Sequence, residues 1–188
     1  STFTKLIMRL YDVDDGSVNL HGRNIKDYRL HDMRKTFGVV PQNPNTERYA
    51  IMQKACRELA EHAASVGGYY AMETGPESSI VLKTFLDSLN SRGVGVNLDP
   101  ANLTMVAGDD AALAVHNLKD YIVHTHAKDG RMFFYKDPEI IYGVRPEGEN
   151  DLKGMSFEEV PLGEGSVNFA AWTQALDEIG YRGFLTIE

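Results

Sequence analysis

From residue 47 onward, segments with helical spacing of apolar residues alternate with short runs that are typical of β-strands. The helical segments lie at about 47–66, 78–93, 109–120 and 168–180, and the strand-like runs lie at 69–75, 94–100, 121–127 and 183–188. Helices that alternate with strands favour a parallel sheet joined by right-handed crossovers. The pattern therefore predicts an α/β fold, which is either a doubly wound sheet or part of an eight-stranded barrel.

The overall composition excludes several classes of protein. The 188 residues carry a formal net charge of -8, whereas proteins that bind nucleic acids or anionic membranes usually present a basic surface. No apolar run approaches the roughly 20 residues that span a bilayer, and the first residues lack the pattern of a signal peptide. We therefore expect no nucleic-acid or membrane partner and a cytoplasmic location. The single cysteine, Cys56, lies in an apolar helical pattern and is expected to be a buried thiol.

The first 45 residues follow a different pattern. A helix end is predicted at 3–11, extended runs at 17–22 and 37–42, and a short helix at 30–36. The polar stretch 42–47 contains a proline and marks a joint between this part and the next. We predict a small α+β fragment in residues 1–45 and a separate unit in residues 46–188.

Four candidate metal ligands stand at the carboxyl ends of the four strand-like runs: Glu73, Asp99, His126 and Glu188. Functional side chains cluster at this end of the strands in parallel sheets and barrels. Consecutive candidates are separated by 26, 27 and 62 positions, and the first two gaps match one helix-plus-strand unit each. One imidazole with three carboxylates makes an oxygen-rich site that suits Mn²⁺, Mg²⁺ or Co²⁺, with Zn²⁺ as a further candidate.

Each of these residues also has a plainer interpretation. A single acid at the end of a strand is usually a solvated loop residue, although four at matching positions are harder to explain in this way. His124 shares a strand face with His126 but lies farther from the strand end, so we expect it to pack beside the site. Glu58 and His62 are at helical spacing and are expected to lie on a solvated face. The remaining histidines are interpreted as surface or helix residues: His21, His31 and His116.

Five phrases give residues 46–188 a family resemblance: METGPES, GVNLDPANL, HTHAKDG, VPLGEGSVNF and ALDEIGYRGFLTIE. Their order and spacing resemble the C-terminal half of the sugar phosphate isomerase/epimerase family, the xylose-isomerase-like TIM barrels. The resemblance implies a partial TIM barrel, about half of one, built from parallel βα units and preceded by the small α+β fragment. It also implies that Glu73, Asp99, His126 and Glu188 are metal ligands, in agreement with their place at the strand ends.

The resemblance further implies a reaction. In the epimerases of this family two glutamates move protons on a ketose or keto acid, so Glu73 and Glu188 become the catalytic acid/base pair. A divalent cation polarises a carbonyl and a hydroxyl on adjacent carbons, which stabilises the enediolate formed when a neighbouring proton is removed. Lys128 is expected either to bind an anionic substrate or to be a surface lysine. Residues 163–165 are interpreted as a flexible substrate loop or a simple turn.

The same barrels include endonuclease IV, a DNA-repair enzyme that binds three zinc ions. Its pattern places a histidine three residues after the aspartate, where this chain has Asn102. Its later aspartate and histidine have no counterpart around SFEEVPLGEG. A DNA-repair nuclease is therefore not expected, and the acidic net charge agrees.

Residues 1–45 resemble a different family, the ATPase domains of exporter-type ABC transporters. The matching stretch is FTKLIMRLYDVDDGSVNLHGRNIKDYRLHDMRKTFGVVPQN, in which Gln42 corresponds to the glutamine of the Q-loop. Ser1 and Thr2 correspond to the end of the P-loop, but the sequence holds neither the glycines and lysine of that loop nor a later signature motif, so ATP hydrolysis is not expected. An ABC ATP-binding fragment and a chimeric chain without activity therefore stay open beside the isomerase or epimerase. A homo-oligomer that covers the exposed edges of the half barrel is a further expectation.

Overall fold

The computed structural model describes residue 13 and residues 15–20, 22–28, 45–143 and 145–188. The chain divides into two compact units. One unit contains Ser1–Val39 and Glu139–Asp151, and the other contains Val40–Pro138 and Leu152–Glu188. The second unit holds the alternating helices and strands that the sequence predicts.

The smaller unit contains a short antiparallel pair of strands. Strands β1 (Asn19–Leu20) and β2 (Arg23–Asn24) join through a turn at Gly22, whose φ of +75° is in the left-handed region that glycine adopts readily. A 3₁₀ turn, η1 (Ile25–Asp27), follows, and the Ile25 side chain is buried. Strand β1 lies within the predicted extended run 17–22, whereas the elements predicted at 3–11, 30–36 and 37–42 lie outside the described residues.

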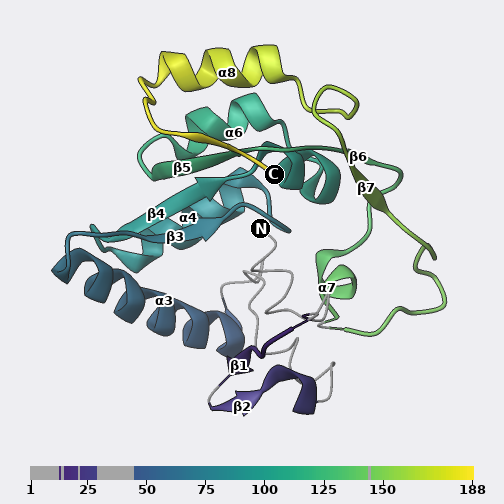
Figure 1. Cartoon of the computed structure of the whole chain (residues 1–188), viewed down its shortest axis with the longest axis horizontal. Coiled ribbons are helices and arrows are strands. Elements are labelled where there is room, and N and C mark those ends of the chain that lie inside the picture. Colours follow the sequence, from purple (N-terminus) through teal and green to yellow (C-terminus); the bar gives the residue numbers. More distant parts are fainter. Residues whose placement is uncertain (1–12, 14, 21, 29–44, 144) are drawn as a thin grey trace. The chain divides into compact units, whose positions relative to one another are not determined.

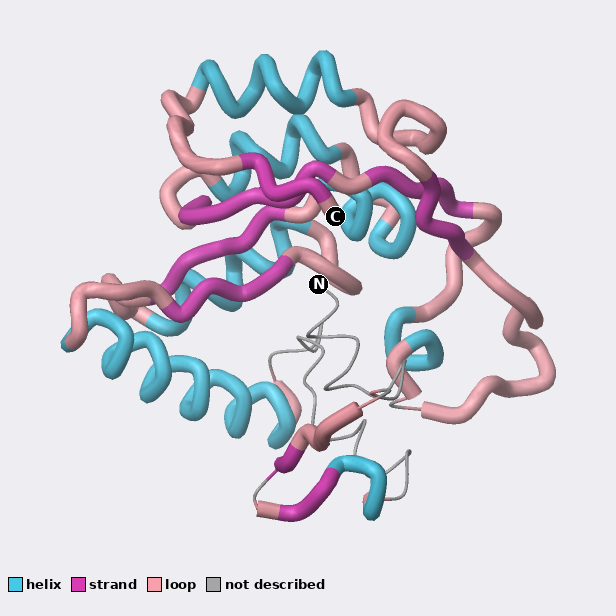
Figure 2. Tube along the Cα trace, in the orientation of Figure 1, coloured by secondary structure: helices cyan, strands magenta, loops and turns pink. Residues whose placement is uncertain are grey.

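The larger unit contains a four-stranded sheet in which all neighbours are parallel, in the order β3-β4-β5-β8. Its strands are β3 (Tyr70–Glu73), β4 (Val94–Leu98), β5 (Ile122–Ala127) and β8 (Leu185–Ile187). The helices that alternate with them are α3 (Glu47–Ser65), α4 (Ser79–Leu89), α6 (Ala111–Leu118) and α8 (Phe169–Glu178). Figures 1 and 2 show this alternation of helices and parallel strands, which confirms the predicted α/β fold.

The helices form one layer over one side of the sheet. Helix α3 packs on α4, α4 on α6, and α6 on α8, so the helices follow the same order as the strands they precede. The core between helices and sheet contains Phe85, Val96, Leu98 and Trp172, all of which are buried. A doubly wound sheet has helices on both faces, whereas a barrel wall has them on one. Of the two arrangements that the sequence leaves open, the structure therefore shows the barrel type.

Polar side chains mark the starts of three of these helices. The Oγ1 of Thr46 accepts a hydrogen bond from the N–H of Tyr49 at 3.1 Å, and the Asp110 carboxylate accepts one from Leu113 at 2.8 Å. The Asn168 side chain caps α8 in the same manner. Such contacts satisfy backbone donors that have no partner within the helix. Ser78 is the residue before α4, but its side chain makes no capping hydrogen bond.

Helix α3 buries a face that matches its apolar pattern only in part, since Cys56 is buried and Met52 packs partly buried against the core, whereas two other members of the predicted stripe are exposed. Spacing predicts a stripe of Met52, Cys56, Leu59, Ala63 and Val66, but the buried residues are Tyr49, Cys56 and Ala60. Leu59 is 49% exposed and Val66 is 71% exposed. The guanidinium of Arg57 donates to the backbone oxygens of Ser88 and Leu89 at 2.9 and 3.0 Å, which turns that side of the helix toward the end of α4. Tertiary contacts therefore rotate the buried stripe by part of a turn.

The stretch 131–165 has no clear helical or strand periodicity and is expected to be mainly loop, but it contributes to a second small sheet. Strand β6 (Asp129–Met132) pairs antiparallel with β7 (Phe157–Val160), and a short helix, α7 (Pro138–Ile141), lies between them in the sequence. The loop prediction is wrong at these positions because the two strands are far apart in the chain and no short hairpin turn signals their pairing. Two further short segments, α5 (Pro100–Asn102) and the π-helical η2 (Leu103–Ala107), follow β4.

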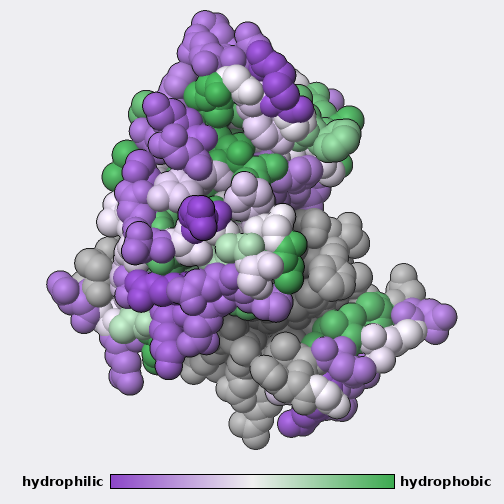
Figure 3. Space-filling view, turned by 90° about the vertical axis from the view of Figure 1, so that its left-hand side faces the viewer, coloured by the Kyte–Doolittle hydropathy of each residue, from purple (hydrophilic) through white to green (hydrophobic). Residues whose placement is uncertain are grey.

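Strand β8 forms one edge of the four-stranded sheet and is largely exposed. Its residues Leu185 and Ile187 are 45% and 75% exposed, and the preceding Phe184 is 83% exposed. Figure 3 shows exposed hydrophobic side chains between hydrophilic ones on one face of the molecule. An exposed apolar edge strand is a surface on which another chain can pair. The expectation of a homo-oligomer therefore stays a prediction. None of the helices in the described ranges is long and apolar enough to cross a bilayer.

Candidate metal centre

The four predicted ligands lie at the same end of the four-stranded sheet. Glu73 is the last residue of β3, and Asp99 directly follows β4. His126 is the second-last residue of β5, and Glu188 directly follows β8. The backbone N–H of Glu188 donates to the carbonyl of Ala127 at 3.2 Å, which continues the β5–β8 pairing up to this residue. All four side chains therefore belong to the carboxyl ends of parallel strands.

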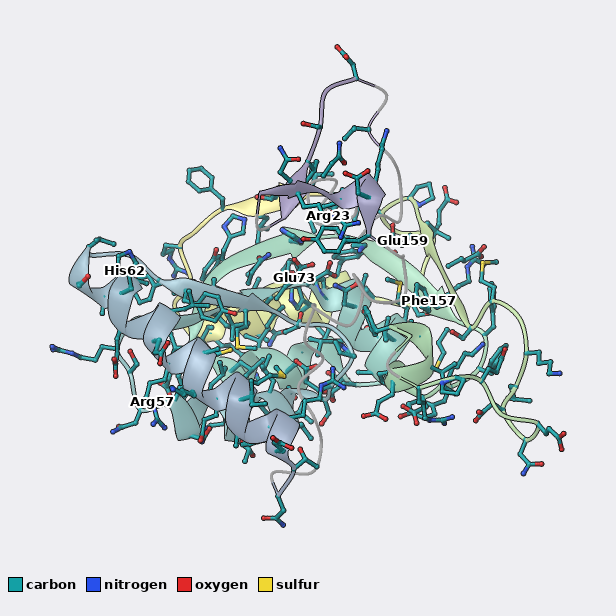
Figure 4. All side chains as sticks on the ribbon, turned by 90° about the horizontal axis from the view of Figure 1, so that it is seen from below. Arg23, Arg57, His62, Glu73, Phe157 and Glu159 are labelled. Atoms are coloured by element: carbon teal, nitrogen blue, oxygen red, sulfur yellow. The ribbon has the colours of Figure 1, made fainter. Side chains whose placement is uncertain are left out.

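These four side chains converge on one point. One ligand atom from each of Glu73, Asp99, His126 and Glu188 lies within 4.8 Å of the others. The Nδ1 of His126 is central, at 2.8 Å from Glu188 Oε2, 3.6 Å from Asp99 Oδ2 and 3.8 Å from Glu73 Oε1. Glu73 is labelled in Figure 4, which shows the side chains as sticks with the molecule seen from below.

The convergence requires a curved sheet. Strands β3 and β8 are its outermost strands, with two strands between them. In a flat sheet, three spacings of about 4.8 Å would hold these strands about 14 Å apart. Glu73 and Glu188 nevertheless bring carboxylate oxygens within 4.8 Å of each other. The ligand end therefore lies on a concave surface, as it does inside a barrel wall.

A shift in strand register puts the histidine on the face of the carboxylates. Val96 pairs with Ile122, but the next residue, Asn97, pairs with His124, so β5 contains one extra residue at Val123. A shift of one residue exchanges the faces on which side chains point. Without this shift, the histidines of β5 would lie on the opposite face from Asn97 and from Glu73, which is itself paired with Asn97. Gly95 makes room for the extra residue, because a Cβ there would lie 2.7 Å from a methyl carbon of Val123.

Burial and charge at the centre fit a cation. The side chain of Asp99 is fully buried, that of His126 is 8% exposed, and Glu188 and Glu73 are 16% and 31% exposed. Oδ2 of Asp99 and Nδ1 of His126 are buried and make no well-directed hydrogen bond with any described residue. Buried polar atoms are normally paired, because an unpaired one costs about 1–3 kcal/mol. Together with Glu73 and Glu188, these two residues supply three carboxylates and one imidazole, which match the donor set of a divalent cation.

The ionisable groups influence one another across the centre. Burial raises the pKa of Glu73, and the negative charges of Asp99 and Glu188 add to this effect. Burial would also raise the pKa of Asp99, but the His126 ring and the Lys128 ammonium outweigh it, so the pKa of Asp99 is lowered. The pKa of His126 is raised, chiefly by its interaction with Asp99. Clustered negative charge without a cation therefore makes protons bind more tightly to Glu73 and His126.

Lys128 lies inside the site rather than on the surface. Its side chain is 7% exposed, and Nζ lies 3.5 Å from Asp99 Oδ2 and 2.9 Å from Glu159 Oε1. It also donates to Asn102 Oδ1 at 3.3 Å. Burial would lower the pKa of Lys128, but Asp99 and Glu159 outweigh this effect and raise it. The interpretation as a surface lysine is therefore wrong, and the role in substrate binding stays a prediction.

Asn102 and Thr74 support the centre through hydrogen bonds that sequence reasoning does not predict. Asn102 donates to Glu73 Oε1 at 3.3 Å and to the carbonyl of Thr74 at 3.0 Å. The hydroxyl of Thr74 donates to the carbonyl of Asp99 at 2.9 Å and accepts from its N–H at 2.8 Å. One carboxylate oxygen of Asp99 accepts hydrogen bonds from the N–H groups of Ala101 and Asn102, which leaves Oδ2 directed toward the centre. The only sequence signal for these roles is their proximity to the predicted ligands.

The predicted loop 163–165 is a turn anchored by one carboxylate. Oδ2 of Asp129 accepts hydrogen bonds from the N–H groups of Gly163 and Gly165 at 3.0 and 2.9 Å. Oδ1 accepts from Gly130 and Val167 at 2.8 and 3.1 Å. Asp129 is 1% exposed. Of the two interpretations of this segment, the structure therefore favours the simple turn.

The remaining candidates lie away from the centre or beside it. His124 contacts Thr186 Oγ1 at 2.8 Å and packs edge-on against His126, in line with the expected packing role. Glu58 and His62 are exposed on α3, where Figure 4 labels His62. His116 is half exposed and lies 3.3 Å from Glu178. Cys56 is a buried free thiol, as predicted. The other predicted residues lie outside the described ones: Ser1, Thr2, His21, His31 and Gln42.

Comparison with known proteins supports the barrel interpretation. A family model described as a xylose isomerase-like TIM barrel matches residues 3–188. A solved xylose isomerase domain protein from Planctomyces limnophilus is 30% identical, with a TM-score of 0.65 over 85% of this chain and 55% of that one. The D-allulose 3-epimerase from Methylomonas sp. is alike in fold, with 21% identity and a TM-score of 0.54 over 78% of this chain and 44% of the other. The chain thus spans about half the length of these structures.

A second similarity covers a smaller share of the chain. The ATP-dependent lipid A-core flippase of Vibrio parahaemolyticus serotype O3:K6 is 42% identical over 81 residues, which is 39% of this chain and 14% of that protein. The mitochondrial ABC transporter B family member 24 of Arabidopsis thaliana is 46% identical over 43 residues, 23% of this chain and 6% of that protein. Both resemblances that the sequence indicates are therefore found, and the chain spans a small part of these curated relatives.

Proposed function

Because the chain belongs to the family of xylose isomerase-like TIM barrels, we propose that its centre binds one divalent cation and isomerises or epimerises a small sugar or keto acid. The observation that carries this proposal is the convergence of Glu73, Asp99, His126 and Glu188 within 4.8 Å at the carboxyl end of the sheet. A solved epimerase with a similar fold acts on D-allulose, which supports a ketose as the substrate class. The proposed ions are Mn²⁺, Mg²⁺ or Co²⁺, with Zn²⁺ as an alternative.

The two glutamates are the proposed acid and base. They come from opposite edges of the curved sheet, so their carboxylates approach a substrate from two sides. One carboxylate accepts the proton on the carbon next to the substrate carbonyl, which leaves an enediolate, and the other returns a proton to the same or the adjacent carbon. Burial of Glu73 shields its carboxylate from water, so that it can exchange a proton with a bound substrate. A bound divalent cation would supply positive charge that stabilises the developing negative charge on the substrate oxygens.

Lys128 is the proposed contact to a substrate oxygen. It is the buried cation beside Asp99, and its ammonium is already oriented by Glu159 and Asn102. A fixed positive charge next to the reaction centre favours an anionic group or the oxygen on which negative charge develops. This role accommodates a keto acid or a sugar phosphate as well as an uncharged ketose.

The flippase similarity supports a second candidate function for residues 1–45. This segment would be an ABC ATP-binding fragment, and the complete chain would be a chimera of two unlike parts. ATP binding would then raise the melting temperature of the chain, and Gln42→Ala would abolish that increase. A chimeric chain without activity would respond to neither ATP nor divalent cations.

Thermal unfolding tests the metal centre directly. The parent, Glu73→Gln and His126→Ala are unfolded in chelator and then in excess Mn²⁺, with His62→Ala on the exposed face of α3 as the matched histidine control. Binding at 100 times the dissociation constant stabilises the folded state by about 2.7 kcal/mol. We expect Mn²⁺ to stabilise the parent and the control but neither ligand variant. Equal behaviour of all four proteins would remove the basis for the proposal.

Solvent isotope exchange tests the proposed reaction. Each ketose or keto acid is incubated with the Mn²⁺-loaded protein in D₂O, and deuterium on the carbon next to the carbonyl is followed by NMR. A proton-transfer mechanism incorporates solvent deuterium, and Glu73→Gln and Glu188→Gln should suppress it. Product formation without deuterium at that carbon would argue for a different mechanism, such as hydride transfer.

A further inference from the structure

A buried amide contacts the ring of the proposed histidine ligand. Nδ2 of Asn97 lies 3.1 Å from Nε2 of His126, on the side of the ring away from the carboxylates. Oδ1 of the same amide is buried and has no hydrogen-bond partner among the described residues. An unpaired buried carbonyl oxygen next to a ring nitrogen is costly, so its presence calls for a physical reason.

The pairing of β4 with both of its neighbouring strands fixes the position of this amide. The register shift after Val96 sets Asn97 opposite His124, so that its side chain lies on the same face as His126. The shift depends on Gly95, which leaves room for Val123. Asn97 is also paired with Glu73 across β3 and β4. The amide is therefore held by two neighbouring strands at the level of the ligands.

Which ring nitrogen of His126 carries the hydrogen determines whether Nδ1 can bind a cation. A neutral imidazole carries one N–H, and a ring whose Nδ1 faces the carboxylates can offer a lone pair there only if the hydrogen is on Nε2. An Nε2–H then needs an acceptor. A half-turn of the Asn97 amide exchanges its two ends and directs Oδ1 at Nε2, while Nδ2 takes the place of the oxygen that now has no partner.

We propose that Asn97 is a positioning residue that selects the tautomer of His126. In the orientation seen here, Nδ2 donates to Nε2, so the hydrogen is on Nδ1 and faces Glu188. In the rotated orientation, Oδ1 accepts from Nε2–H, and Nδ1 is free to bind a cation. The change moves one hydrogen from Nδ1 to Nε2 and alters no net charge. This inference rests on the proposed function, since it concerns a cation at the same centre.

Calorimetric titration with Mn²⁺ separates the acceptor role of Asn97 from its role in packing. Asn97→Leu keeps the approximate volume but removes the acceptor, Asn97→Asp keeps an acceptor, and Asn117→Leu on α6 is the control, because its amide contacts Ser79 away from the centre. Loss of the partner that orients a metal-binding histidine typically weakens binding about 10- to 100-fold. We expect that loss for Asn97→Leu and not for Asn97→Asp or the control, with equal melting temperatures in chelator for parent and Asn97→Leu.

Asn97→Asp adds a negative charge that can itself change the affinity for an ion. NMR of ¹⁵N-labelled histidine rings, with diamagnetic Zn²⁺, therefore measures the position of the ring hydrogen directly. In the loaded parent and Asn97→Asp, the His126 ring should show protonated Nε2 and a bound Nδ1, whereas Asn97→Leu should show a mixture of ring states. If Asn97→Leu binds Mn²⁺ as tightly as the parent while Glu73→Gln does not bind it, the role of Asn97 is overturned but the proposed function stands. A parent that binds neither ion would overturn the proposed function and this inference together.

Discussion

The Lys128 ammonium nitrogen lies 2.9 Å from Oε1 of Glu159 and thereby links strand β7 to the candidate metal centre. The same nitrogen is 3.5 Å from Oδ2 of Asp99. A positive charge at this place has two opposite effects: it keeps Asp99 ionised, and it repels a cation bound to that carboxylate. In the proposed function, this lysine would therefore lower cation affinity while it contacts the substrate.

Lys128→Met should reveal this balance. Removal of the positive charge is expected to tighten Mn²⁺ binding by roughly tenfold, because the charge is close to a ligand and largely buried. Turnover should nevertheless fall by about tenfold or more, since a substrate oxygen loses its proposed partner. Titration calorimetry and the isotope-exchange assay measure the two quantities, with Lys119→Met on the exposed surface as control. Weaker Mn²⁺ binding in Lys128→Met would contradict the electrostatic argument.

Asp129→Asn should destabilise the turn at residues 163–167. The carboxylate accepts four backbone N–H groups, and an amide offers only one oxygen in place of two. Buried hydrogen bonds to a charged group contribute about 1.5–3 kcal/mol each, so we expect a loss of about 2–4 kcal/mol in the free energy of unfolding. Urea denaturation in chelator measures it. The exposed Asp177→Asn is the matched control, and a loss no larger than in that variant would show that the four contacts matter little.

Gly95→Ala should disturb the register shift that positions the histidines. The new methyl group would lie 2.7 Å from a methyl carbon of Val123, and overpacking of this kind costs about 1–3 kcal/mol. Because the clash has one partner, the double variant Gly95→Ala with Val123→Ala should recover part of the loss. A double-mutant cycle in urea tests this coupling. Additive losses in the two single variants would mean that the two side chains do not meet.

Stability should depend on pH through Glu77. The side chain is 4% exposed, and burial raises its pKa to about 7. A carboxyl group that is protonated more readily in the folded state contributes stability at low pH, and this contribution is lost as the pH rises from about 4.5 through about 7. The loss reaches up to about 3 kcal/mol above that range. Glu77→Gln should flatten this part of the profile in urea titrations at several pH values, and an unchanged slope would exclude Glu77 as the cause.

The four candidate ligands could be placed from the sequence because each depends on local information. Apolar alternation defines where a strand ends, and the end of a parallel strand is also where side chains meet. For Glu73 and Glu188 to meet, successive strands must be neighbours in one curved sheet. The repeated helix-plus-strand pattern in the sequence already indicates such a sheet. Their roles as ligands and as acid and base stay predictions.

Other features depend on contacts that no local pattern carries. The partner of Lys128 is in β7, a strand that pairs with β6 across a long excursion of the chain, so the lysine was left with an open interpretation. The role of Asn97 depends on one extra residue in β5, which alternation alone does not show. The apolar spacing in α3 predicts the burial of Cys56 but not the exposure of Leu59, on a helix whose Arg57 binds the end of α4. In each case a tertiary contact overrides the periodicity.

The strand order implies that an ion at the centre would hold the two outer strands of the sheet together. Glu73 and Glu188 belong to the two outer strands of the sheet. Three segments of the chain, each containing helix and strand, connect the four candidate ligands in sequence. An ion held by all four groups would connect these two outer strands in the folded chain and so oppose their separation. Strand β8 pairs with β5 through Leu185, Thr186 and Ile187, and its separation from β5 would withdraw Glu188 from such an ion.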